Sequence, residues 1–243
     1  MAQIRYKRIL LKISGEALGQ KTSQGDGFGL DFGKLNAVCA SIKQCVDMGV
    51  QVGLMVGAGN FWRGVKDGAD KMQRSHADAM GMLGTVINCL CMSDALRQAG
   101  VDCVVQSAVD MDRFCEPFNA VAARRHLAAG RGVLFAAGSG NPFFSTDTAV
   151  ALRAVEIQAD AIMMAKNIDG VYTADPAKDP TATLIKDITY REALNRGLKV
   201  MDAAAFAICA EQKLPMVRVF GLDDPENLIK VLQGDEMGTF VHP

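Results

Sequence analysis

Four times along this chain an apolar, strand-like segment runs into a short turn of small and polar residues. Such segments, separated by helical patterns, are typical of a mainly parallel sheet covered by helices on both faces. The carboxyl ends of parallel strands meet at one edge of the sheet, where α/β proteins place their ligand crevice. The strand segments are residues 9–13, 52–56, 133–137 and 161–165, followed by turns at 14–15, 57–60, 138–141 and 166–167.

The segments between the strands have helical periodicity. Apolar residues from position 32 to 46 recur at spacings of three and four, which predicts a helix with one apolar face. Asp31 is its expected N-cap and Gly49 its expected end. Residues 175–188 contain two prolines and are predicted to form a loop. Further helices are expected at 76–98, 118–129, 146–158, 202–212 and 225–232. Three of the strands named above are expected to span 7–13, 50–56 and 161–164, and two further strands are expected at 103–105 and 216–220.

Composition argues against several classes of protein. The net charge of −1 gives no basic footprint for nucleic acid. The longest uncharged stretches, 79–93 and 132–146, contain 15 residues each, whereas a membrane span needs roughly 20. The N-terminal apolar stretch is too short for a signal peptide. Seven cysteines without a C-x-x-C pair indicate reduced core residues of a cytoplasmic protein, and three scattered histidines argue against a Cys/His metal site.

Residues 79–92 stand out because they carry no charge and are apolar on nearly every side of a helix. A helix that is apolar all round is expected to be buried. Burial in the core of the monomer and burial against a second subunit both agree with this pattern.

Two cations accompany the glycine turns. Lys12 ends the first strand and Arg63 follows the second turn. Glycine lets backbone N–H groups approach a phosphate closely, and fixed positive charge stabilises it. Neither turn has the G-x-G-x-x-G pattern, and no G-x-x-x-x-G-K-[ST] segment occurs, so Rossmann and P-loop folds are disfavoured. Two glycine turns with two cations predict two phosphate-bearing ligands in one cleft, as in a kinase.

Each motif also has a purely structural explanation. Lys12 can end a strand in solvent, the second turn can be tight packing, and Asp78 can be a favourable first-turn acid of the next helix. Ser145, Thr146 or Asp147 can cap a helix, although a helix N-terminus with hydroxyls also binds phosphate. Residues 169–176 can be a bare turn, or place an aromatic ring beside a purine and a carboxylate on a ribose hydroxyl.

Taken together, these motifs make the chain resemble the bacterial-type UMP kinases of the amino-acid kinase superfamily, over nearly its whole length and in the same order. The resemblance implies a three-layer α/β/α sandwich and the reaction of ATP with UMP to give ADP and UDP, at the first step of UTP and CTP supply. It further implies Mg²⁺ carried by the ATP phosphates, a homohexamer, GTP as activator and UTP as inhibitor. The matching segments are 7–18, 57–64, 80–83, 140–147, 169–176 and 199–202.

The resemblance also assigns residues to roles, with Lys12, Arg63 and Asp147 as the catalytic set and no protein ligand for the metal. In one domain, 1–243, the soft lobe 1–159 would hold the acceptor and the phosphate loops, and 160–243 would be the ATP-binding lobe. The residues assigned to ATP are Lys12, Ile13, Ser14, Gly15, Gly59, Arg63, Lys166, Asn167, Tyr172 and Asp175. Those assigned to UMP are Gly57, Ala58, Asp78, Ser139, Gly140, Asn141, Pro142, Phe143, Phe144, Ser145 and Thr146. Those assigned to the allosteric segment are Gly25, Asp26, Gly27, Phe28 and Gly29.

Three positions depart from the family pattern. Ala58 replaces the middle glycine of a Gly-Gly-Gly-Asn turn and requires a negative φ there. Ala79 stands where histidine is expected, and the segment 19–25 is longer than usual. Two other functions remain open: an amino-acid or carbamate kinase, and a nucleotide-binding storage or sensor protein without turnover.

Catalysis by these residues would rest on positioning and electrostatics. The second pKa of the acceptor phosphate is about 6, so this phosphate is mostly dianionic and already nucleophilic at neutral pH, and it needs no strong base. Lys12 is expected to stabilise the donor phosphates and Arg63 to bridge toward the acceptor phosphate. Asp147 is expected to orient a Mg²⁺-bound water or Lys12, and Asp78 to accept from ribose hydroxyls.

Overall fold

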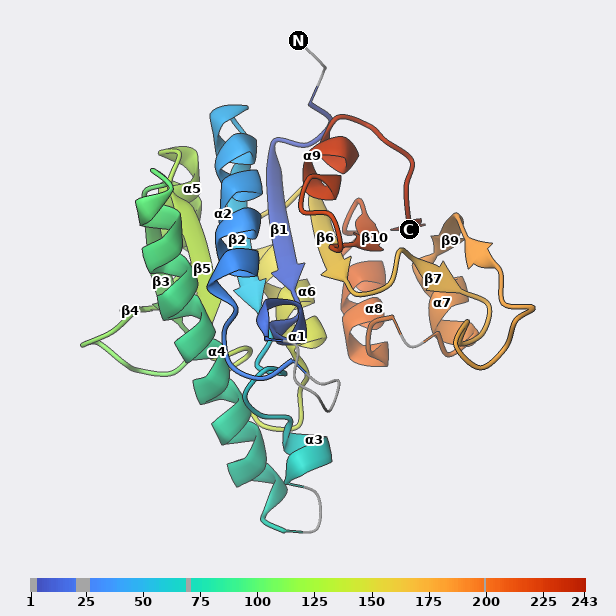
Figure 1. Ribbon diagram of the computed structural model, residues 1–243, viewed down its shortest axis with the longest axis horizontal. Coiled ribbons are helices and arrows are strands. Elements are labelled where there is room, and N and C mark those ends of the chain that lie inside the picture. The colour runs from blue at the N-terminus through green and yellow to red at the C-terminus, as the bar shows by residue number, and fades with distance from the viewer. Residues whose placement is uncertain (1–3, 21–26, 69–70, 199) are drawn as a thin grey trace.

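The computed structural model describes residues 4–20, 27–68, 71–198 and 200–243 (Figure 1). Nine strands of these residues form one sheet in which every neighbouring pair is parallel except β10 and β11. The strands in their order across the sheet are β4 (Glu116–Pro117), β3 (Cys103–Ser107), β5 (Gly132–Ala136), β2 (Gln51–Val56), β1 (Arg8–Ile13), β6 (Ala161–Lys166), β10 (Val217–Gly221), β11 (Thr239–His242) and β9 (Asp187–Thr189).

Helices cover both faces of this sheet, so the expected three-layer α/β/α sandwich is confirmed. Figure 1 shows α2 in front of the sheet and α6 behind it. Side chains of β1 alternate between the two cores, with Ile9 and Leu11 on the α2 side and Leu10 on the α6 side. The helices α2 (Phe32–Asp47), α4 (Arg74–Gln98) and α9 (Asn227–Leu232) pack into one core, and α5 (Ala120–Ala128), α6 (Thr146–Glu156), α7 (Tyr190–Asn195) and α8 (Ala203–Glu211) into the other.

Several local signals act as expected. Asp31 accepts hydrogen bonds from the amides of Gly33 and Lys34 at 3.0 and 3.2 Å and caps α2, and Gly49 follows this helix with a φ of +84°. All of the predicted helices and strands are present, with ends that differ by up to a few residues. Three short helices, α1 (Gly15–Leu18), α3 (Gly64–Asp67) and α7, lie in segments that were not predicted to be helical.

The prediction that residues 175–188 form only a loop is wrong. They contain β8 (Leu184–Ile185), which pairs with β7 (Val171–Tyr172), and the first residues of β9. β9 joins the main sheet by pairing with β11, which the sequence did not predict either. Such short edge strands lack a periodic pattern of their own, because what stabilises them is the partner strand.

The apolar helix predicted from residue 76 begins at Arg74 as α4, and its N-terminal half extends past the sheet beside α3 (Figure 1). α4 is long and apolar enough to cross a membrane by length and composition, but it packs against α2, β3 and β5, and half of its apolar window is buried. Met80, Leu83 and Ile87 remain 39, 50 and 49% exposed. Within one chain, α4 is therefore buried on one side only, although its sequence led us to expect burial on all sides.

Candidate active site

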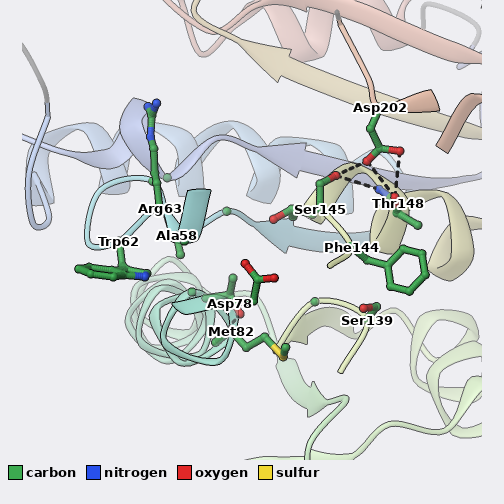
Figure 2. A pocket seen from close by; sticks show the side chains of 18 of the residues that line it. Ala58, Trp62, Arg63, Asp78, Met82, Ser139, Phe144, Ser145, Thr148 and Asp202 are labelled. Carbon is green, nitrogen blue, oxygen red and sulfur yellow. Dashed lines mark hydrogen bonds between the residues drawn. The ribbon is translucent and has the colours of Figure 1, made fainter. Parts of the chain in front are cut away.

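The parallel register brings the polar turns together. Ile13, the last residue of β1, lies opposite Val56 on β2 and Ala165 on β6, so the turns after these strands begin at the same level. β5 pairs with β2 on its other side. At this edge of the sheet lies a cavity of ≈ 710 Å³, lined by the turns after β1, β2 and β5, by the first half of α4 and by the start of α8 (Figure 2).

The first two turns pack backbone against backbone. A Cβ on Gly15 would lie 2.4 Å from the carbonyl oxygen of Gly57 and 2.4 Å from Asn60 Oδ1, so no side chain fits there. Ala58 is buried, and its φ lies outside the left-handed region, as an alanine at this place requires. The glycines therefore allow a close approach of two loops at the wall of the cavity.

A buried pair of amide side chains supports the second turn. Asn60 Nδ2 donates to Asn88 Oδ1 at 3.0 Å, and Asn88 Nδ2 donates back to Asn60 Oδ1 at 2.8 Å. Asn88 Nδ2 also donates to the carbonyl oxygen of Gly57 at 2.7 Å. Both side chains are at most 1% exposed. Sequence reasoning missed Asn88, because an asparagine within an apolar helical segment gives no sign of its distant partner.

Lys12 reaches the cavity from β1 and forms an ion pair with Asp147, with 3.1 Å between Nζ and Oδ1. Ser145 is the N-cap that the sequence left open among three residues: its Oγ accepts from the amides of Asp147 and Thr148 at 3.0 and 3.4 Å. Asp147 Oδ1, the oxygen of that ion pair, is buried and accepts no other hydrogen bond from the described residues. The carboxylate is thus available to a further polar partner.

Lys166, at the end of β6, brings a second cation near the pair of Lys12 and Asp147. Its Nζ donates to the carbonyl oxygen of Val200. Burial lowers the pKa of Lys166, Asp147 opposes that shift, and the charge of Lys12 adds to it. The three side chains therefore form one interacting group of two cations and a carboxylate.

Arg63 forms an ion pair with Glu16, a residue of α1 that sequence reasoning did not assign. Both side chains line the cavity, and they are 40 and 32% exposed. The backbone amide of Arg63 donates to Asp67 Oδ2 at 2.8 Å, which fixes the start of α3. The guanidinium therefore rests on a solvent-accessible carboxylate, from which an anionic ligand can draw it.

Asp78 projects from α4 toward the cavity. In Figure 2, Arg63 lies on one side of it and Asp202 on the other. Asp78 does not open the helix, because α4 begins at Arg74, whose Nε contacts the two Asp78 oxygens at 2.8 and 2.9 Å. Asp78 Oδ2 also accepts from the amide of Phe143, at 2.8 Å. The loop after β5 is thereby fastened to α4.

Asp202 joins two helix starts at the opposite end of the cavity. It caps α8 by accepting from the amide of Ala205 at 2.8 Å, and it accepts from Thr148 Oγ1 at 2.9 and 2.8 Å. It also accepts from Ser145 Oγ (Figure 2). Arg74, Asp202 and Glu16 were not assigned from the sequence, although Asp202 and Glu16 belong to matching segments.

The structure brings most of the assigned residues to one cavity but not all. The adenosine-end residues lie outside it: Tyr172 Oη donates to Asp169 at 2.9 Å, and Asp175 lies 3.6 Å from Lys178. Ile13 is fully buried. The assigned residues that line the cavity are Lys12, Ser14, Gly15, Gly57, Ala58, Gly59, Arg63, Asp78, Ser139, Asn141, Phe143, Phe144, Ser145 and Thr146. Those that do not are Ile13, Gly140, Pro142, Asp147, Lys166, Asn167, Tyr172 and Asp175.

The segment expected to be allosteric is described in part, since Gly25 and Asp26 lie outside the described residues. Gly27 and Phe28 line a neighbouring cavity of ≈ 400 Å³ that also contacts Arg63. The amide of Gly29 donates to the carbonyl oxygen of Asn60 at 2.9 Å. This end of the segment is thus bonded directly to the turn after β2.

Comparison with known proteins places this arrangement in a family. The model of the Amino acid kinase family matches residues 7–219. The chain belongs to the amino acid kinase family. Among solved members, a UMP kinase from Bacillus anthracis has a TM-score of 0.92 at 32% identity over 98% of this chain and 96% of its own. A UMP kinase from Ureaplasma parvum has a TM-score of 0.89 at 35% identity, with 99 and 100% covered.

A uridylate kinase from Archaeoglobus fulgidus shares the fold with a TM-score of 0.73 at 24% identity, with 96% of this chain and 99% of its own covered. These similarities confirm the amino acid kinase fold predicted from the sequence. They also confirm the family to which the six matching segments pointed.

Proposed function

We propose that this amino acid kinase is a UMP kinase, which transfers the γ-phosphoryl group of ATP to UMP and forms UDP and ADP. One observation carries the proposal: Lys12 and Arg63 enter one cavity beside two glycine turns at the same edge of the sheet. The similarity to two UMP kinases over nearly the whole chain supports uridylate as the acceptor. It favours this function over an amino-acid or carbamate kinase and over a storage or sensor protein.

Transfer of the phosphoryl group requires that two polyanions approach each other. Lys12 stabilises the donor phosphates and the charge that spreads over the transferring group. Arg63 leaves Glu16 for the phosphate oxygens between the two nucleotides, which its planar guanidinium can contact in pairs. The acceptor phosphate is mostly dianionic at neutral pH, because its second pKa is about 6, so no general base is needed.

The two substrates occupy opposite ends of the cleft in this proposal. Residues 1–159 hold UMP at the turns after β2 and β5, and Asp78 accepts from ribose hydroxyls. Residues 160–243 hold the adenosine end through Lys166, Asn167, Tyr172 and Asp175. The remaining assigned residues, Ile13, Ser14, Gly15, Gly59, Gly140, Pro142 and Asn141 among them, complete the phosphate and acceptor loops in this single domain.

Mg²⁺ bound to the ATP phosphates would supply further neutralisation of charge. Asp147 fits a role beside that ion, because its Oδ1 is buried and, apart from the ion pair with Lys12, accepts no hydrogen bond within the described part of the chain. The protein's own contribution at this point is to hold Asp147 close to Lys12 and to orient it through the Ser145 cap.

Assembly and regulation complete the proposal. The exposed apolar side chains of α4 support a homo-oligomer, for which we propose a hexamer. The bond between Gly29 and Asn60 gives GTP, as activator, and UTP, as inhibitor, a route from the segment 25–29 to the phosphate turn. We further propose that the enzyme is cytoplasmic, as its reduced cysteines suggest, and supplies UDP for pyrimidine nucleotides.

An ADP-release assay with ATP and Mg²⁺ tests the proposal. UMP, CMP, dTMP, AMP, carbamate and amino acids are offered in parallel, and the product is identified by chromatography. UMP is expected to give the highest kcat/KM, with UDP as product. ATP binding without turnover would indicate a sensor, and turnover with a small carboxylate or carbamate alone would indicate the other kinase class. The same assay with GTP or UTP added tests regulation, and light scattering tests the hexamer.

A further inference from the structure

Arg74 is the first residue of α4, and its side chain lines the cavity although no phosphate role falls to it. It lies one helical turn before Asp78, so the two side chains meet on one side of the helix. Its Nε lies 2.9 Å from Oδ1 and 2.8 Å from Oδ2 of Asp78. The carboxyl side chain is 13% exposed and the guanidinium 44% exposed. Arg74 therefore covers the outer side of a carboxylate that is otherwise enclosed.

The other contacts of Asp78 leave it little freedom. Its Oδ2 accepts from the amide of Phe143 at 2.8 Å. On the side of Oδ1, a Cβ on Gly64 would lie 2.5 Å away, so α3 begins directly against the carboxylate. Three separate segments, at residues 64, 74 and 143, thus fix one carboxylate at the wall of the cavity.

Arg74 also acts on the other partner of that hydrogen bond. Phe143 has a φ of +73°, in the left-handed region that non-glycine residues seldom adopt. Its ring lies 6.0 Å from the Arg74 guanidinium, within the range of a cation–π contact. Such a backbone conformation persists only where its surroundings hold it. Asp78 and Arg74 together supply that support to the acceptor loop.

We propose that Arg74 is a positioning residue that sets the preference for ribonucleotide over deoxyribonucleotide acceptors. This inference rests on the proposed function, in which Asp78 accepts from the ribose hydroxyls. By holding both oxygens on one side, Arg74 directs their remaining lone pairs into the cavity. A site built to bind a hydroxyl discriminates against the analogue that lacks it only while its acceptor is held in place.

Steady-state kinetics with UMP and dUMP test this role, with Arg74→Gln and Arg74→Lys as variants. Arg196→Gln is the control, because Arg196 forms an exposed ion pair one turn from Glu192. We expect Arg74→Gln to raise KM for UMP about tenfold, as loss of one charge-assisted hydrogen bond would. KM for dUMP, which lacks the 2′-hydroxyl, should rise by a clearly smaller factor than KM for UMP, and KM for ATP should change less than about twofold. Arg74→Lys should lie between, since lysine keeps the positive charge but not the fixed planar geometry of the guanidinium.

Equal losses for UMP and dUMP would overturn the proposal, since Arg74 would then act on the phosphate or on folding alone. So would an unchanged UMP to dUMP preference together with a melting temperature lower than that of the control. If the unmodified protein forms no UDP, the proposed function fails by itself. Calorimetric binding of UMP and dUMP then still measures the preference: a ratio of Kd values that Arg74→Gln leaves unchanged refutes the role of Arg74.

Discussion

Gly84 of α4 faces the turn that carries Ala58, and the space between them is filled. A Cβ on Gly84 would lie 2.9 Å from Ala58 Cβ. Carbon atoms in contact are about 3.5–4.0 Å apart, so in Gly84→Ala the turn or the helix must move by roughly 0.6–1.1 Å. The alanine that replaces a glycine in the turn therefore requires the glycine in the helix.

The free-energy change can be worked out from this contact. Overpacking of a filled site typically costs about 1–3 kcal/mol, whereas replacing glycine by alanine inside a helix gains about 1 kcal/mol. Gly84→Ala alone should lower the free energy of unfolding by about 0–2 kcal/mol. In an Ala58→Gly background the clash is absent, and the same change should raise it by about 1 kcal/mol. The predicted coupling energy is thus about 1–3 kcal/mol.

Urea unfolding of the parent, both single variants and the double variant measures the coupling, at one protein concentration because assembly affects stability. Since the displaced turn carries the acceptor-phosphate loop, KM for UMP should rise in Gly84→Ala and recover in the double variant. The reasoning is refuted if Gly84→Ala stabilises the parent by about 1 kcal/mol and the two changes add within about 0.5 kcal/mol.

Three further predictions concern charge and thiols. Lys12→Ala should lower kcat about 10²–10³-fold with the fold retained by circular dichroism, and a loss below tenfold would contradict its assignment. Because burial lowers the pKa of Lys166, kcat should fall on the alkaline side below the ordinary lysine value of 10.5, and Lys12→Ala should move that limb upward in a pH profile. Because the pKa of Lys166 is lower in the folded than in the unfolded chain, the unfolded chain binds this proton more readily, and the free energy of unfolding should rise with pH up to 10.5. Lys166→Met should be more stable than the parent and inactive, as thermal unfolding and the ADP assay would show. A thiol reagent should label four thiols only slowly in the native protein, since burial raises their pKa to about 12, and rapid labelling of any of them would contradict their burial; the four are Cys39, Cys45, Cys89 and Cys209.

The position of the cleft followed from the sequence because its signals are local. Each apolar segment and the turn after it are contiguous, and a parallel register brings such turns to one edge without further information. The Asp31 cap and the site of Lys12 could be inferred for the same reason. The loop predicted across β8 and β9 was wrong because the pairing of these strands depends on residues far along the chain.

What surrounds the reactive groups was decided by the tertiary structure. The hydrogen bond between Asp78 and Phe143 joins residues 65 apart, and that between Ser145 and Asp202 joins residues 57 apart. Such contacts depend on side-chain rotamers and on packing between layers, which no periodicity within one segment records. The sequence by itself determined the layers, the glycine turns and the cations, since short-range sterics and apolar patterning fix these. Only the folded chain decided that Glu16 pairs with Arg63 and that Asp202 joins Ser145 and Thr148, because these contacts require distant segments to meet.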